Sequence, residues 1–213
     1  MATPDNTRSK TLPVGVHTQG GLKQEPPLSE SDPTNGYRFN HCMLRIRDPE
    51  PTLHFHVDLM GMRTIFALNT GPITVCYLGY PQSAEHRANP ALFAQETAPH
   101  SAMTQTLELC HYHGTERDSN GYISTGNDPP HLGFSHLGVT VPNVADAVQR
   151  LRRAGVKVAK DVGEGPNEAI PITKWEMGQK GIATEDLDPK FLKIINQIAF
   201  VEDPVSPNID LQI

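Results

Sequence analysis

The sequence has little basic charge for a protein that would bind nucleic acid. It carries 18 Lys and Arg against 24 Asp and Glu, a formal net charge of −6. A nucleic-acid face normally requires clustered positive charge. One of the densest basic stretches, RLRR at 150–153, falls in a predicted helix, where it indicates a solvated face. We therefore expect no nucleic-acid partner.

Cysteines are few and long apolar runs are absent. The three cysteines, Cys42, Cys76 and Cys110, lie in strand-like segments and have no CxxC-type spacing, which argues against a disulfide framework. No stretch approaches the ~20 apolar residues of a membrane span, and the N-terminus has no apolar run typical of a signal peptide. We expect a reduced, cytoplasmic protein with no membrane partner. Its hydrophobic content of 37% is enough for a core.

The most informative feature is a repeat. GFSHLGVTV at 133–141 has the same layout as FNHCMLRIRD at 39–48: a histidine, an alternating strand, and a turn into a helix. Each copy then reaches a glycine followed by an apolar and a basic residue, GMR at 61–63 and GVK at 155–157. His41 and Gly61 are 20 residues apart and His136 and Gly155 are 19 apart, so one gap aligns the copies.

Each copy ends on a strand that carries an acid. Glu108 lies in TLELC, 67 residues after His41, and Asp210 lies in NIDLQ, 74 residues after His136. Two imidazoles and two carboxylates suit a divalent metal and leave positions open for water and substrate. A lone histidine at the start of a strand is more often a packed or exposed residue, so the argument for a metal site depends on the repetition.

The pattern divides the chain into an arm, two modules and a linker. We assign residues 1–36 to a polar, flexible arm, 37–111 to the first module, 112–132 to a linker loop, and 133–213 to the second module with an insertion at 163–196. Helices are predicted at about 49–59 and 144–154, where Asp48-Pro49 and Asn143 are start signals.

Three motifs, in this order, resemble those of glyoxalase I (lactoylglutathione lyase) and the vicinal oxygen chelate superfamily. They are HCMLRIRDPEPTLHFHVDLMGM at 41–62, TLELCHYHGTE at 106–116 and GFSHLGVTVPNV at 133–144. The resemblance covers about residues 32–213 and implies an α+β fold of paired βαβββ modules. It implies that His41, Glu108, His136 and Asp210 hold one divalent metal per site, with zinc or nickel first and iron, cobalt or manganese as alternatives.

The resemblance also implies a reaction and an assembly. A metal-dependent lyase or isomerase of this kind moves a proton next to a carbonyl through a metal-stabilised enediolate. Asp210 and Glu108 are the catalytic carboxylates, with Asp210 as both metal ligand and base. The family builds its site between modules of opposite subunits, so a homodimer is expected. The partner is a small-molecule substrate, with a glutathione adduct among the options.

Several positions depart from the family pattern. Asp210 is one methylene shorter than the family's glutamate. Arg45 matches the arginine that holds the glutathione carboxylate, but Tyr112 replaces an asparagine and Leu132 replaces an arginine, with His131 as its polar neighbour. We take Arg45, Tyr112 and His131 as substrate-binding candidates. A leucine cannot make the two parallel hydrogen bonds that a guanidinium makes to a carboxylate. The substitutions at these positions therefore favour a substrate other than the methylglyoxal–glutathione hemithioacetal.

Two other functions stay open at this point. His41, His136 and one acid would also make the facial triad of an Fe(II)-dependent dioxygenase. The same scaffold would also serve a non-catalytic protein that binds a small molecule. The identity of the metal separates the dioxygenase from the lyase, and small-molecule affinity without metal would indicate the binding protein.

Overall fold

The computed structural model describes residues 12–19, 26–99, 102–118, 123–204 and 208–212, with only the backbone described for 208–210. The chain forms two compact units. One unit holds residues 38–164 and 197–213, and therefore both modules. The other combines residues 1–37 with 165–196. The arm and the insertion, which the sequence assigned to separate places, thus belong to one unit.

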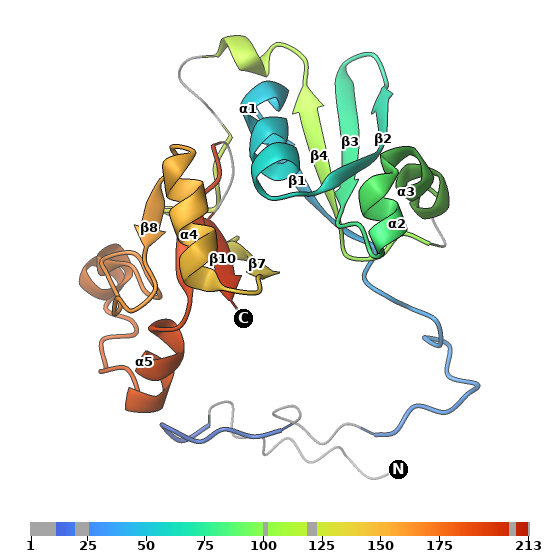
Figure 1. Ribbon diagram of the computed structural model, residues 1–213. Helices are drawn as coiled ribbons and strands as arrows, with labels where there is room; N and C mark the ends of the chain where they lie inside the picture. Colours follow the sequence, from blue (N-terminus) through green and yellow to red (C-terminus); the bar gives the residue numbers. More distant parts are fainter. Residues whose placement is uncertain (1–11, 20–25, 100–101, 119–122, 205–207, 213) are drawn as a thin grey trace. The chain divides into compact units, whose positions relative to one another are not determined.

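The first module is a four-stranded sheet with one helical segment. Its elements are β1 (His41–Ile46), α1 (Pro49–Leu53), the π-helix η1 (His54–Leu59), β2 (Arg63–Asn69), β3 (Ile73–Gly79) and β4 (Thr106–Tyr112), and the strand order is β1-β4-β3-β2 (Figure 1). The helix starts at Asp48, whose carboxylate accepts from the Glu50 N–H. The turn after η1 uses Gly61 at a φ of 80°, which favours glycine.

The second module repeats this arrangement. Its elements are β7 (His136–Thr140), α4 (Val144–Arg153), β8 (Val158–Lys160), β9 (Ala199–Glu202) and β10 (Asn208–Gln212), in the order β7-β10-β9-β8. Asn143 caps α4 by accepting from the Asp146 N–H. Gly155, at a φ of 83°, makes the turn that Gly61 makes in the first module. The predicted α+β fold of paired βαβββ modules is confirmed.

The strand register is identical where the candidate ligands lie. In the parallel pair β1–β4, His41 is opposite Thr106, and Glu108 follows Thr106 by two residues. In the parallel pair β7–β10, His136 is opposite Asn208, and Asp210 follows Asn208 by two residues. Because side chains alternate with a period of two, Glu108 lies on the same sheet face as His41, and the backbone of Asp210 has the corresponding register to His136.

Two apolar clusters form the core. One covers a face of the first sheet and includes Leu44, Ile46, Met62, Leu78, Leu107 and Leu109. The other joins α4 to the second sheet through Val144, Val148, Leu151, Ala199, Val201 and Leu211, and it also contains Phe55 of η1. Arg150 of α4 donates to the Leu59 carbonyl at 2.6 Å. The helical segment of the first module therefore packs on the helix of the second.

Two connecting segments contain further elements. Within the first module, α2 (Ala84–Ala88) and α3 (Pro90–Thr97) lie between β3 and β4, and α3 packs against β2. The stretch predicted as a linker, 112–132, contains the 3₁₀-helix η2 (Thr115–Arg117) and a two-stranded sheet of β5 (Asn127–Asp128) and β6 (His131–Leu132). No helix among the described residues is long and apolar enough to cross a membrane.

The smaller unit has two helical elements, the π-helix η3 (Glu176–Lys180) and α5 (Pro189–Ile195). Lys180 lies over the Trp175 ring at 4.9 Å. Gly15 of the arm contacts the start of α5, where the Lys190 ammonium donates to the Gly15 carbonyl at 3.3 Å. The arm around Gly15 therefore lies against the insertion of its own chain.

Candidate metal centre

His41 and Glu108 meet on one face of the first sheet. The parallel pairing of β1 and β4 places them in adjacent rows, and His41 Nε2 lies 3.1 Å from Glu108 Oε2. The His41 side chain is 36% exposed and that of Glu108 is 15% exposed. The pair is thus shielded on the side of the sheet and open on the other, which leaves room for a further ligand.

Asn40 sets the orientation of the His41 ring. The Asn40 amide nitrogen donates to the Met103 carbonyl at 3.1 Å, which leaves its oxygen to face His41 Nδ1 at 2.8 Å. An oxygen acceptor at Nδ1 places the proton of a neutral imidazole there. The lone pair of Nε2 then points toward the carboxylate, as in histidines that bind a metal through Nε2.

Tyr77 holds Glu108 from the next strand. Its hydroxyl donates to Glu108 Oε2 at 2.7 Å, and its ring contacts His41 edge-on at 5.3 Å. Burial, together with the hydrogen bond and the charge of Glu108, raises the pKa of Tyr77 to about 12. The phenol therefore remains a donor at neutral pH. Phe66 stacks on Tyr77 at 4.6 Å and restricts its movement.

Removal of this donor is expected to weaken metal binding. Tyr77→Phe keeps the ring and its packing but leaves Glu108 without the bond that orients its carboxylate, and loss of such partners typically costs about 10- to 100-fold in metal affinity. Competition with a chromogenic chelator would measure the change. Tyr37→Phe, at an exposed tyrosine of the arm, is the control. An unchanged affinity in Tyr77→Phe would show that the hydrogen bond does not support a metal ligand.

The geometry of the pair fits a metal. Two ligands about 2.0–2.2 Å from one cation and roughly at right angles are about 3 Å apart. The observed 3.1 Å between Nε2 and Oε2 matches this spacing. Neutral His41 and ionised Glu108 both present lone pairs to each other, so a cation or an added proton is needed between them. His41 and Glu108 would therefore hold a divalent cation with mixed N and O preference.

The second module presents a related half-site. His136 is exposed at the start of β7, its Nδ1 lies 3.1 Å from the Ser135 hydroxyl, and its ring meets Phe200 edge-on at 5.4 Å. In both modules the residue before the histidine therefore contacts Nδ1. The backbone register puts Asp210 in the place that Glu108 has in the first module.

The four predicted ligands do not form one cluster in the described part of a single chain. His41 and Glu108 are paired, but no group of three or more His, Cys, Asp or Glu side chains that could hold a metal occurs among the described residues. The side chain of Asp210 lies outside what the structure describes.

The face around His41 carries exposed apolar groups. Met43, Glu108, Tyr77 and Phe66 form one row across the sheet by register, and Arg45, Cys110, Val75 and Leu68 form the next row. Met43 is 45% exposed and Leu68 is 55% exposed. The opposite face is buried in the core cluster of Leu44, Ile46 and their neighbours. An exposed apolar surface that surrounds a polar pair is typical of an interface.

Two of the three substrate-binding candidates lie together. The Arg45 guanidinium lies over the Tyr112 ring, 4.6 Å from its centroid. Both are on the face of His41, and Arg45 is four residues along β1, roughly 13 Å away at ~3.3 Å per residue. His131 is exposed on β6, and no described contact joins it to Arg45 or Tyr112.

The histidines after Glu108 support a turn. His111 Nε2 lies 2.9 Å from Glu116 Oε2, and His113 Nε2 lies 2.8 Å from the Thr74 hydroxyl. Backbone hydrogen bonding at Glu116, then the contact with His111 and the Gly114 N–H, lower the pKa of Glu116 to about 2. These contacts stabilise the loop at the end of β4. His111 and His113 therefore contact that loop and Thr74, and they do not orient Glu108.

Asn40 and Tyr77 were not identified from the sequence. Asn40 has one signal: it precedes His41 as Ser135 precedes His136, so the repeat itself places a polar residue at the same offset. No sequence pattern identifies Tyr77, because its position opposite Glu108 depends on the register of β3 with β4.

Paired βαβββ modules with a histidine and a carboxylate on the open sheet face define the vicinal oxygen chelate class. In agreement with this, residues 38–186 match the Glyoxalase/Bleomycin resistance protein/Dioxygenase superfamily, and the chain belongs to this family. The resemblance found in the sequence motifs is thereby confirmed. The matched range includes His41, Glu108 and His136 and ends before β9 and β10, which carry Asp210.

Curated relatives are named lactoylglutathione lyase. The protein of Pseudomonas aeruginosa is 30% identical over 156 residues, which is 72% of this chain and 84% of the relative. The protein of Schizosaccharomyces pombe is also 30% identical, over 133 residues and 62% of this chain, but the chain spans only 39% of that protein's length. Among solved structures, the trypanothione-dependent glyoxalase I of Leishmania major is 19% identical, covers 83% of this chain and 86% of its own, and has a TM-score of 0.48.

Proposed function

We propose that the protein is a metal-dependent lyase or isomerase that moves a proton next to a carbonyl. The observation that carries this proposal is the pair of His41 Nε2 and Glu108 Oε2 at 3.1 Å, each oriented by its own partner, Asn40 or Tyr77. The matching register of His136 and Asp210 supplies the second half of the ligand set. Deuterium exchange at the carbon next to the carbonyl, followed by NMR for a panel of α-hydroxycarbonyl compounds in D₂O, tests the reaction type.

The proposed roles of the residues follow from their chemistry. A divalent metal at this site would act as a Lewis acid and stabilise negative charge on substrate oxygens. His41, Glu108 and His136 would hold it. Asp210 is proposed as the fourth ligand and as the base that takes the proton from one carbon and returns it to the next. Tyr77 keeps Glu108 in place, and the apolar groups around the pair exclude water.

The assembly we propose is a homodimer in which each site combines His41 and Glu108 of one chain with His136 and Asp210 of the other. The exposed Met43 and Leu68, which lie on the same sheet face as His41, support this, because that face is not covered by the apolar core. The separation of His136 from the His41–Glu108 pair within the described chain also supports it. The three cysteines are free thiols, which fits the cytoplasmic location expected from the composition.

Light scattering is expected to report a mass of about twice the 23.4 kDa of one chain. The apolar groups on the open sheet face, Met43 and Leu68, provide the driving force. Met43→Asp should shift the population toward monomer and lower metal content with it. Met177→Asp, at an exposed methionine of the smaller unit, is the matched control. A monomeric wild-type protein that retains one metal per chain would contradict the shared site.

Mixing two inactive variants tests the shared site directly. In a mixed dimer of His41→Ala and His136→Ala chains, one site has lost both histidines and the other keeps all four ligands. Random assortment makes about half of the dimers mixed, so about a quarter of wild-type activity should return. A site built within one chain would recover nothing on mixing, because every chain then lacks one ligand.

We further propose that the substrate is not the methylglyoxal–glutathione hemithioacetal. Tyr112 lies under the Arg45 guanidinium, and Leu132 offers no charge at the position where the family has an arginine. Arg45 remains as one anchor for a negative group roughly 13 Å from His41. We propose an α-hydroxycarbonyl compound with a single acidic group at this distance, such as a specialised metabolite.

Lactoylglutathione formation is therefore expected to be weak or absent. Glutathione carboxylates that are left without donors lose affinity, since an unpaired buried charge costs several kcal/mol. An absorbance assay with methylglyoxal and glutathione would measure it, and kcat/KM should fall below ~10⁴ M⁻¹s⁻¹. The reversion Leu132→Arg should raise the value, whereas Leu12→Arg in the arm should not. A wild-type value in the usual enzyme range would show that glutathione is the natural thiol.

A further inference from the structure

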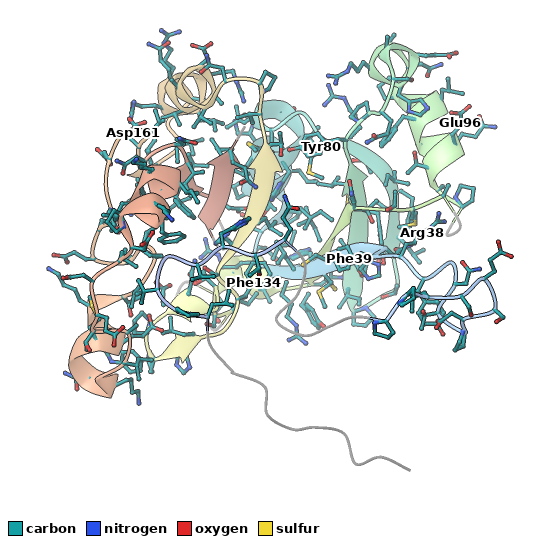
Figure 2. The ribbon with its side chains drawn as sticks, turned by 90° about the horizontal axis from the view of Figure 1, so that it is seen from below. Arg38, Phe39, Tyr80, Glu96, Phe134 and Asp161 are labelled. Atoms are coloured by element: carbon teal, nitrogen blue, oxygen red, sulfur yellow. The ribbon has the colours of Figure 1, made fainter. Side chains whose placement is uncertain are left out.

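A cavity of about 230 Å³ lies behind the first sheet, between the two modules. Its lining is mainly apolar and comes from both: Cys42, Met60, Met62 and Leu107 from the first module, and Leu137 and Val139 from the second. Phe39 and Tyr80, which are labelled in Figure 2, also line it. An apolar cavity of about 150 Å³ is large enough to hold benzene, so this one has room for a substituted ring.

This cavity is separate from the candidate metal centre. Side chains alternate along a strand, so Cys42 and Leu107 point to the opposite face of the sheet from His41 and Glu108. Both Cys42 and Leu107 pack with the core cluster on that face. A molecule in contact with Cys42 and Leu107 would therefore lie on the other side of β1 and β4 from His41 and Glu108. Thr106, which pairs with His41 in the register, lines the cavity at the start of β4.

A buried histidine is part of the cavity wall. His56 lines the cavity and is 2% exposed. Its Nε2 lies 2.6 Å from Asp203 Oδ2, but the contact is not aligned as a hydrogen bond. His56 Nε2 is therefore buried beside a carboxylate without an aligned hydrogen bond, so the ring retains hydrogen-bonding capacity. His56 belongs to the π-helix η1, and such turns often occur at functional sites.

We propose that this cavity binds a small neutral molecule, mainly apolar, whose single hydroxyl or carbonyl oxygen pairs with His56. The apolar lining excludes a charged ligand, because burying an unpaired charge is costly. An anion is disfavoured further by the Asp203 carboxylate beside His56. Gln105 and Thr106 also line the cavity, and the Thr106 hydroxyl donates to the Asn40 carbonyl at 3.0 Å. An aromatic ring of the size of phenol fits the volume and leaves its hydroxyl to pair with His56.

The site is tested by measuring how far phenol protects Cys42 from alkylation. The experiment uses the wild-type, metal-free protein, so the result does not depend on the proposed reaction. Phenol should slow alkylation of Cys42 several-fold and leave Cys76 unchanged, as mass spectrometry of the modified peptides would show. Cys76 packs with the same core cluster but does not line the cavity. Benzoate should protect neither. Equal slowing of both thiols, or no slowing of Cys42 up to the solubility limit of phenol, would overturn the proposal.

Variants test the cavity and its polar anchor separately. Val139→Phe fills the cavity and should abolish phenol binding in ligand-observed NMR, whereas Thr140→Phe, the same change at the next, exposed residue of β7, should not. The double variant His56→Phe, Asp203→Leu removes the polar pair without leaving a buried charge. It should weaken phenol binding about 5- to 10-fold and change toluene binding less than twofold. Unchanged phenol binding in both variants would overturn the assignment.

Discussion

Asp210→Asn is expected to lower turnover by ~10² to 10⁴ while most of the metal is retained. The change removes the base, but the amide still offers an oxygen to the metal. The readout is deuterium exchange next to the carbonyl, with the best compound from the α-hydroxycarbonyl panel, beside metal content. Asp58→Asn, at an exposed acid that pairs with His54, is the control and should change neither.

The opposite result would assign Asp210 to the surface of the second module. If turnover and metal content of Asp210→Asn stay near wild type, Asp210 is a residue of β10 with no role in metal binding or catalysis. Glu108 would then be the remaining candidate base. Lower metal content together with lower turnover would instead show that the amide cannot replace the carboxylate as a ligand.

His136→Ala is expected to empty the metal site. The variant removes one of the four proposed ligands, and because His136 is exposed at the start of β7, the packing lost is mainly its edge-on contact with Phe200. Elemental analysis of the purified protein, after dialysis against a weak chelator, should fall from one metal per chain to a small fraction. His54→Ala, at a histidine whose side chain is 60% exposed, is the control.

The same measurement distinguishes the remaining functions. Full metal content in His136→Ala would remove the second half-site from the proposal and leave only His41 and Glu108. Iron as the native metal, with oxygen consumption, would favour a dioxygenase over a lyase. A wild-type protein that binds a small molecule but no metal would be a binding protein on this fold.

Much of the fold could be predicted from local patterns. The helices over 49–59 and 144–153 follow from the caps Asp48 and Asn143, and the glycines that end both helical segments have the positive φ that the repeat suggests. The strands follow from alternation: TLELC and NIDLQ, the strands that end the two copies, correspond to β4 (Thr106–Tyr112) and β10 (Asn208–Gln212). These features depend on neighbours within a few residues, so the sequence contains the information directly.

The candidate site was only partly predictable for the same reason. The repeat identifies His41, Glu108, His136 and Asp210, because the two modules share one layout and their strands share one register. Tyr77 could not be found this way, because its contact with Glu108 spans 31 residues and depends on which strand lies beside β4. Nor could a π-helix be distinguished from an α-helix within 49–59, since both present a similar apolar pattern.

The sequence alone therefore determined the family and the two modules, and it predicted the chemical types at the candidate metal centre, because each depends on local periodicity and on the repeat. The tertiary structure decided which residues support those types, with Asn40 on His41 and Tyr77 on Glu108. It also decided that the arm joins the insertion in one unit and that His56 and Asp203 meet beside a cavity. His56 and Asp203 are 147 positions apart, and a contact across such a distance arises only when whole elements pack.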